Sequence, residues 1–274
     1  MKYLLCILIA LFAIPSVVFC QEVIFFYDFN DEDVGKPPSD PWKATGAGEV
    51  EVDEVPDAIN KSVKITDSGS GGGMTLLLDT PIAGKIVSLE FKFMREKKWT
   101  LACEIFYAMN QKCPDDWSGI CIKDSDNGKI AYHNGANWID AVLIEDEVWH
   151  DIKLTFYLDK DKYDFYYDGK EIANNLGYRN WGGLSKEGID KFNVANVGNG
   201  GSTFIKYYDD IILYEGTERN VAVRSRDKLS TVWGRVKTSA FEDPYRKYPN
   251  GHKATRFERG LLPLAYSKFD RLSL

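Results

Sequence analysis

Histidine and cysteine are scarce in this chain of 274 residues, which has 3 His and 5 Cys. Cys6 and Cys20 fall in an apolar N-terminal segment, which leaves Cys103, Cys113 and Cys121. No CxxC pair and no closely spaced histidines occur, so the ligands of a zinc enzyme are missing. The three remaining cysteines are close in sequence, and we expect one local disulfide with one thiol left over.

Long apolar runs are scarce as well. Residues 4–13 (LLCILIALFA) form one before Pro15, but it is shorter than the roughly 20 residues of a membrane-spanning helix. It is typical of a secretory signal peptide. We expect a signal peptide of residues 1–20 with cleavage near Cys20-Gln21. The alternative is lipid attachment at Cys20, which the bulky Phe19 disfavours.

No later segment is apolar enough to cross a bilayer. We therefore expect no transmembrane segment and a soluble mature chain that is secreted, periplasmic or at the cell surface.

A basic surface is missing from most of the chain. The net charge is −7, yet residues 219–274 carry 13 Lys or Arg against 5 Asp or Glu, a balance of +8 that leaves −15 on residues 1–218. An acidic body argues against nucleic acid as a partner, because phosphate binding needs basic surface. The basic tail either contacts an acidic glycan or the cell surface, or is simply solvated.

Long amphipathic helices are also missing, and strand patterns take their place. In residues 87–94 (VSLEFKFM) and 151–158 (DIKLTFYL), apolar and polar side chains alternate, as in strands with one buried face. Six further segments show the pattern less regularly: 99–109, 118–123, 129–133, 163–167, 191–197 and 203–214. An antiparallel, all-β, two-sheet sandwich follows from short strands at this spacing.

Turn residues separate these segments. Asp168-Gly169 has the residue types of a tight type I′ hairpin turn, and Asn127-Gly128 and Asn134-Gly135 are further candidates. Residues 67–73 (DSGSGGG) are glycine-rich and predict a mobile loop. In the tail, apolar residues recur at helical spacing over 227–237, and the rest of it predicts irregular structure.

Three segments resemble one family. They are FYDFNDEDVG at 26–35, WHDIKLTFYLDKDKYDFYYDGKEI at 149–172 and IKYYDDIILYEG at 205–216. They are similar to concanavalin A-like, laminin G-like jelly-roll domains, in which the closing strand pairs beside the N-terminal strand. The resemblance implies one such domain over residues 21–218, followed by a basic extension, 219–274. It fixes the fold more than the function, because the superfamily includes lectin-like modules, glucanases and polysaccharide lyases.

The resemblance also implies a structural calcium ion where the first and last strands meet. The matching oxygen donors are Asp28, Asn30 and Asp209, with Asp210 as a further candidate. Hard oxygen ligands suit Ca²⁺. The alternative is that the paired aspartates are edge-strand charges and that Asp28 caps a turn. No organic cofactor is indicated.

Sugar binding is the next candidate chemistry, because aromatic rings stack on the apolar faces of pyranoses. The candidates are Tyr132, Trp138, Trp181 and Tyr208. The alternative for each of them is packing in the core or at the rim of the sandwich.

Catalytic motifs are absent. The Glu-x-Asp-x-x-Glu run of related glycoside hydrolases does not occur, nor does Gly-x-Ser-x-Gly. A polysaccharide lyase needs a cation, a base and an acid, for which outward-facing His133, Tyr208, Lys206 and Lys92 are candidates. However, alginate-lyase motifs are missing, and a turn role explains His133 equally well. We therefore assign no catalytic residue.

Three functions stay open. The first is a non-catalytic carbohydrate-binding, lectin-like module whose partner is an extracellular or cell-surface polysaccharide. The second is a polysaccharide-degrading enzyme, most plausibly a lyase. The third is an extracellular structural or interaction protein that makes its contacts through the basic tail.

Overall fold

The computed structural model describes residues 22–57, 59–69, 71–113, 118–180, 187–197 and 203–219. Over these residues the chain forms a succession of short strands and almost no helix. The strands are β1 Val23–Tyr27, β2 Trp42–Gly46, β3 Glu49–Asp53, β4 Ser62–Asp67, β5 Gly72–Ile82, β6 Ile86–Arg95, β7 Cys103–Met109, β8 Ile120–Asp124, β9 Lys129–His133, β10 Trp138–Leu143, β11 His150–Tyr157, β12 Lys162–Tyr167, β13 Lys170–Gly177, β14 Ile189–Asn196 and β15 Phe204–Glu215.

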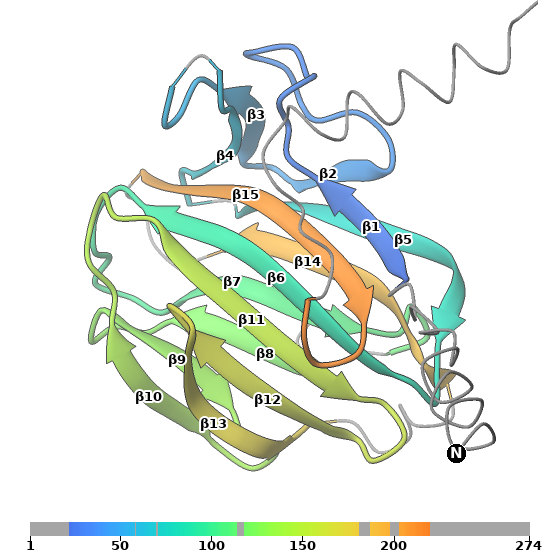
Figure 1. Ribbon diagram of the computed structural model, residues 1–274. Coiled ribbons are helices and arrows are strands. Elements are labelled where there is room, and N and C mark those ends of the chain that lie inside the picture. Colours follow the sequence, from blue (N-terminus) through green and yellow to red (C-terminus); the bar gives the residue numbers. More distant parts are fainter. Residues whose placement is uncertain are drawn as a thin grey trace, which may run out of the picture. The chain divides into compact units, whose positions relative to one another are not determined.

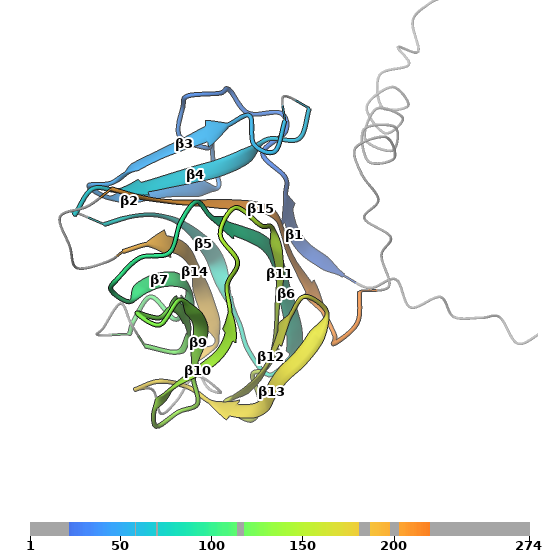
Figure 2. The same ribbon diagram turned by 90° about the vertical axis from the view of Figure 1, so that its left-hand side faces the viewer.

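The strands form two antiparallel sheets that pack face to face (Figures 1 and 2). Sheet A has the order β13-β12-β11-β6-β15-β4-β3, with β1 also paired to β15. Sheet B has the order β10-β9-β8-β7-β14-β5-β2. The predicted all-β sandwich is confirmed, and so is the pairing of the first strand with the closing strand.

The alternating segments face the core as their pattern predicts. Val87, Leu89, Phe91 and Phe93 of β6 are buried between the sheets, as is the matching apolar series of β11. Each large apolar side chain removed from water contributes about 1.5–3 kcal/mol. Period-two alternation therefore places the two central strands of sheet A correctly.

The hairpin between β12 and β13 also has the predicted geometry. Asp168 has φ of 49° and Gly169 has φ of 72°, so both central residues have the positive φ of a type I′ turn. The Asp168 carboxylate then accepts the Asp151 backbone N–H at 2.8 Å. The turn is thereby tied to β11.

The glycine-rich segment 67–73 differs from the expectation of a mobile loop. Gly72 and Gly73 are buried in β5, and the Asp67 carboxylate accepts the backbone N–H groups of Gly69 at 2.7 Å and Gly71 at 2.8 Å. A Cβ at Gly72 would lie 3.1 Å from the Gly48 Cα. The glycines therefore permit close approach of two chain segments.

The expected signal peptide and the tail, including its predicted helix over 227–237, lie outside the described residues. In the part of the chain that is described, no helix has the length and apolarity needed to cross a membrane.

One hydroxyl bridges the two sheets across the core. Tyr208 of β15 in sheet A is fully buried, and its Oη lies 2.6 Å from the Ala195 carbonyl and 3.0 Å from the Ile105 carbonyl, both in sheet B. Its buried environment raises the pKa of Tyr208 well above the usual value. The phenol is therefore a neutral donor.

We expect Tyr208→Phe to lower the free energy of unfolding by about 1–3 kcal/mol, because buried carbonyl oxygens lose their donor. Urea denaturation measures the change. The matched control is Tyr166→Phe, since the Tyr166 hydroxyl makes an exposed 3.4 Å contact with Glu171, and its removal should cost almost nothing. Equal effects of the two variants would contradict the bridging role.

Candidate functional site

The outer face of sheet B, turned away from the core, carries a row of aromatic and polar side chains. On β7, Phe106 and Ala108 join the main core, whereas Tyr107 and Met109 form a separate cluster with Cys121. Tyr107 lies opposite Asn193 of β14 and opposite Cys121 of β8. Because neighbours in register share a face, one continuous row crosses the middle of the sheet.

Trp138 ends this row on the edge strand β10. It lies opposite His133 of β9, and the two rings meet edge to face with centroids 5.3 Å apart. Lys123 Nζ lies 4.4 Å from the Trp138 ring centroid, and the Arg179 guanidinium carbon lies 6.0 Å from it. We call Tyr107, Lys123, His133, Trp138 and Arg179 the Trp138 cluster.

The Trp138 cluster contains two cations and is partly desolvated. Burial lowers the pKa of Lys123, partly offset by Asp140 and Asp126. Burial also lowers the pKa of His133, and the nearby Arg179 and Lys123 charges act in the same direction. The carboxylates of Asp140 and Asp126 act on Lys123, and Glu104 lies opposite it in the β7–β8 pair. The cluster therefore combines an aromatic ring with two cations and nearby carboxylates.

His133 has a structural role in addition. Its Nδ1 accepts the Gly135 backbone N–H at 3.1 Å, and its carbonyl accepts the Tyr163 hydroxyl at 2.6 Å. An accepting Nδ1 belongs to the neutral imidazole with its proton on Nε2. The turn role considered for His133 is therefore present.

A shallow hollow of about 530 Å³ opens beside the same face, toward β2 and β5. Lys43 in its wall lies opposite Thr75, and Leu77 lies opposite Lys191. The Lys191 ammonium in turn lies 5.5 Å from the Tyr107 ring centroid. Cationic and aromatic groups therefore extend from the Trp138 cluster toward this hollow.

The proposed lyase residues do not come together. Lys206 and Tyr208 are fully buried between the sheets, whereas Lys92 is on the outside of sheet A, near Asp151 and Asp210. Lys206 and Tyr208 are therefore not outward-facing, as the sequence suggested. A bulge between Asp209 and Ile212, with Asp210 at φ of 50°, reverses the inside–outside alternation of β15.

The four aromatic sugar-binding candidates also separate. Trp138 lies on the outer face of sheet B, as described. The Tyr132 ring packs 5.7 Å from Phe165 against the main core, and Tyr208 is buried. Trp181 lies outside the described residues. Only part of the predicted aromatic platform therefore shares one face.

Sequence reasoning missed Tyr107, Lys123, Arg179 and Lys191. A β-bulge between Glu104 and Phe106 shifts the register of β7. A strict period-two pattern therefore does not predict to which side of the sheet Tyr107 points. Arg179 lies in a loop after β13, where it forms an isolated β-bridge with Gly119. No local sequence pattern indicates that its side chain contacts the Trp138 ring. The alternation of ICIKD (120–124) was the one available signal, since it puts Cys121 and Lys123 on one face.

The calcium candidates lie near one another where β1 meets β15. Burial raises the pKa of Asp209 to about 8, and the negative charges of Asp210 and Asp28 act in the same direction. The Asn30 side-chain oxygen accepts the Lys61 backbone N–H at 2.8 Å. Within the described residues, no three His, Cys, Asp or Glu side chains are close enough to form a metal site by themselves.

No disulfide joins Cys103, Cys113 or Cys121, so the expected local disulfide is not formed. Cys103 is buried against Lys206, on the side of β7 that faces sheet A, whereas Cys121 belongs to the cluster on the outer face of sheet B. Opposite faces of one sheet separate these two side chains. Closeness in sequence was therefore misleading.

Comparisons with known proteins show the fold. No protein-family model and no curated protein matches the chain. A structure of a carbohydrate esterase from the Shiga toxin-encoding bacteriophage phi24B matches 72% of this chain and 100% of its own, with a TM-score of 0.53 and 17% identity. A structure described with endo-acting O-glycanases of human gut microbiota that initiate mucin breakdown has the same coverage and identity, with a TM-score of 0.52.

A sialidase also matches, with a TM-score of 0.49 and 8% identity over 65% of this chain, which spans 17% of the sialidase. The two-sheet architecture, together with the two matches at TM-scores of 0.53 and 0.52, shows a jelly-roll β-sandwich.

We expect the pKa of His133 to lie below the ordinary value of about 6.5, and to rise when Lys123→Gln and Arg179→Gln remove the neighbouring charges. Proton NMR of the imidazole during a pH titration measures it. Because the unfolded chain binds this proton at higher pH than the folded chain, stability should fall as pH drops below about 6.5. His133→Gln should remove that part of the pH dependence, and an ordinary pKa would contradict the electrostatics described here.

Proposed function

We propose that this is a secreted carbohydrate-binding module of the concanavalin A-like superfamily that takes an acidic glycan on the outer face of sheet B. The observation that carries the proposal is the Trp138 cluster, where Lys123 and Arg179 lie over the ring of an edge-strand tryptophan. Aromatic rings provide apolar contact for a pyranose, and the cations pair with carboxylate or sulfate groups. The module is non-catalytic.

Several features support this site over other surfaces. Lys191, opposite Leu77 of β5, extends the cationic groups of this face beyond the Trp138 cluster, whereas Tyr107 is buried and supports the site from within. On the outside of sheet A, Lys92 is paired with Asp151 and Asp210, and Arg219 is paired with Glu90. These cations are already neutralised, which makes that face less suited to an acidic chain. The two fold neighbours described with carbohydrate-directed activities accord with a glycan as the partner.

We expect Trp138→Ala and Lys123→Ala each to weaken binding to a uronate-rich polysaccharide by roughly 10-fold, from the loss of about 1–2 kcal/mol of contact energy. Affinity electrophoresis or calorimetry against uronate-rich, sulfated and neutral polysaccharides measures the change. The control is Tyr166→Ala, which removes a matching pair on the other sheet, where Lys153 Nζ lies 5.2 Å from the Tyr166 ring centroid.

Retention on neutral glycans alone would contradict the acidic preference. If a chain ending at residue 218 loses all binding, the tail rather than the sandwich makes the contact, and the structural or interaction alternative is favoured instead.

A polysaccharide lyase is the second candidate, favoured by a neutral histidine beside Tyr107, Lys123 and Arg179. Lyase cleavage leaves an unsaturated sugar that absorbs at about 235 nm, and proton abstraction needs a base with an available lone pair. His133 uses its Nδ1 to hold the turn, which weighs against this role. New absorbance that disappears in His133→Gln would replace the binding module by the lyase.

A calcium ion between β1 and β15 is a separate proposal, with Asp28, Asp209 and the Asn30 backbone as oxygen donors. Asp209 is buried, its pKa is raised, and Asp28 and Asp210 lie close to it. A divalent cation would stabilise the charged form of such a carboxyl group. The bound ion would fix the start of the domain to its closing strand.

We expect millimolar calcium to raise the melting temperature by roughly 5–10 °C if the calcium concentration is about 100-fold higher than the Kd of the site. Differential scanning fluorimetry with calcium and with a chelator measures this shift. Asp209→Asn should remove the response, whereas Asp57→Asn, in an exposed turn where Asp57 accepts two backbone N–H groups, should keep it. No shift in the parent protein would exclude the site.

A further inference from the structure

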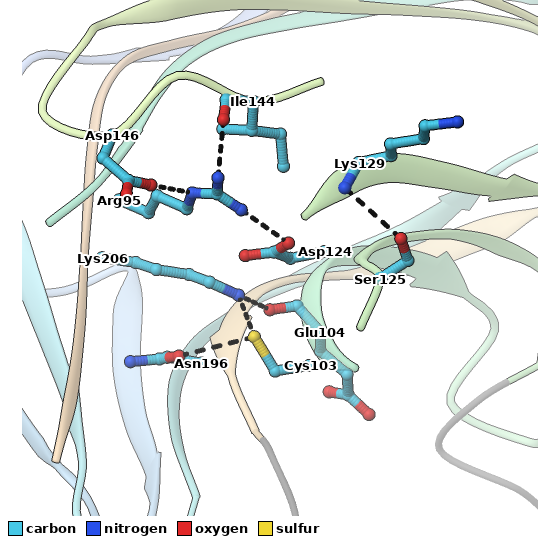
Figure 3. A network of polar contacts seen from close by, with 10 residues as sticks. All are labelled: Arg95, Cys103, Glu104, Asp124, Ser125, Lys129, Ile144, Asp146, Asn196 and Lys206. Atoms are coloured by element: carbon cyan, nitrogen blue, oxygen red, sulfur yellow. Dashed lines mark hydrogen bonds and ion pairs between the residues drawn. The ribbon is translucent and has the colours of Figure 1, made fainter. Parts of the chain in front are cut away.

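A lysine and a cysteine meet inside the sandwich, away from the Trp138 cluster. Lys206 of β15 and Cys103 of β7 are both 0% exposed. Lys206 Nζ lies 2.7 Å from Cys103 Sγ and 2.5 Å from the Glu104 carbonyl oxygen (Figure 3). The two side chains come from opposite sheets and point toward each other across the core.

The nitrogen–sulfur distance is too short for an ordinary contact between an ammonium group and a thiol. An N–H···O bond spans about 2.7–3.2 Å, and sulfur is larger than oxygen by roughly 0.3 Å, so an N–H···S bond is longer still. Single N–O and O–S bonds that meet at a near-tetrahedral oxygen would place nitrogen and sulfur roughly 2.6–2.7 Å apart. The geometry matches that second arrangement.

We propose that Lys206 and Cys103 are joined through one oxygen atom in an N–O–S bridge. The step consumes molecular oxygen: the amine, the thiol and O₂ give the bridge and one water. One hydrogen leaves the sulfur and one leaves the nitrogen, and both end in that water. Sulfur and nitrogen each lose two electrons, and the four electrons reduce the two oxygen atoms.

The surroundings hold both partners in place for this reaction. The Cys103 thiol faces the Asn196 side-chain oxygen at 3.9 Å, and the Asn196 amide nitrogen is fixed by the carbonyls of Ile65 at 2.9 Å and Phe204 at 2.7 Å. The Glu104 carbonyl anchors the lysine nitrogen. Neither side chain can rotate away without leaving buried polar groups unpaired.

The buried position also restricts the oxidant. Burial raises the pKa of Cys103 to about 12, although the Lys206 charge acts in the opposite direction. Large disulfide reagents cannot reach a thiol that is fully enclosed, whereas dioxygen is small and apolar. Trapping by the adjacent amine stops the sulfur at the bridge before the irreversible sulfinic stage.

The bridge would be a covalent tie between the two sheets. It closes a segment of about 100 residues between β7 and β15, and such a cross-link restricts the unfolded chain. We therefore expect the bridged protein to melt roughly 5–15 °C higher than the reduced protein. Dithiol reductant, which returns the amine, the thiol and water, should reverse the shift.

The test is intact-mass spectrometry of the purified chain kept in air, before and after reduction. One oxygen gained and two hydrogens lost make the bridged chain about 14 Da heavier than the reduced chain. Tryptic digestion should then yield one species in which the peptide with Cys103 is linked to the peptide with Lys206. The added mass and the linked species should both disappear on reduction.

Three variants make the result specific. Cys103→Ser and Lys206→Met should each lack the mass increase. Cys121→Ser should keep it, since Cys121 is equally buried but its Sγ faces the Ser118 carbonyl at 3.8 Å. If the core variants fail to fold, the mass of the unsubstituted protein before and after reduction still tests the proposal.

Other masses overturn the proposal. Equal masses before and after reduction mean that the two groups are only in contact. An unlinked gain of about 16 or 32 Da means ordinary sulfenic or sulfinic oxidation, and a linked loss of about 2 Da means a direct sulfur–nitrogen bond.

Discussion

The burial of the Arg95 guanidinium at one end of the sandwich constrains the rest of the structure. Arg95 ends β6 with its guanidinium 2.9 Å from Asp124, 2.6 Å from Asp146 and 2.5 Å from the Ile144 carbonyl oxygen (Figure 3). Lys206 is enclosed beside it. An unpaired buried charge is strongly destabilising, so the ends of β8 and β10 in sheet B must lie where the Arg95 guanidinium needs acceptors. The buried charge thereby fixes the position of the β8 and β10 ends of sheet B relative to the end of β6 in sheet A.

This inner constraint also shapes the outer face of sheet B. Lys206 holds the Glu104 carbonyl, at the point where the β7 bulge begins. Because of the bulge, Tyr107 points to the outer face of sheet B. Glu104, on the other side of the bulge, lies opposite Lys123 of the Trp138 cluster. The buried Lys206 nitrogen on one side of the sheet therefore helps to position the cations on the other side. The core and the candidate site are one connected arrangement.

The sequence was sufficient to predict the strands in which one face is apolar and the other is polar. Residues 129–133 coincide with β9, and the regular alternation in 87–94 and 151–158 places β6 and β11. It was insufficient where a bulge changes the alternation, as at Asp210 in β15, because bulges depend on contacts across the sheet. The site was only partly predictable for the same reason: Trp138 was identified, but Arg179 joins it through tertiary structure. Lys206 looked like a surface cation because lysine is rarely buried.

The position of β15 has a consequence for how the chain reaches its native state. β15 is the last strand among the described residues, yet it lies within sheet A and pairs with β1, β4 and β6. Sheet A stays divided until residues 204–215 have left the ribosome, so the domain cannot assemble progressively from its N-terminus. Its contacts are mostly non-local, which makes assembly slow. The core of the sandwich is therefore completed only after the segment that carries β15 has been synthesised.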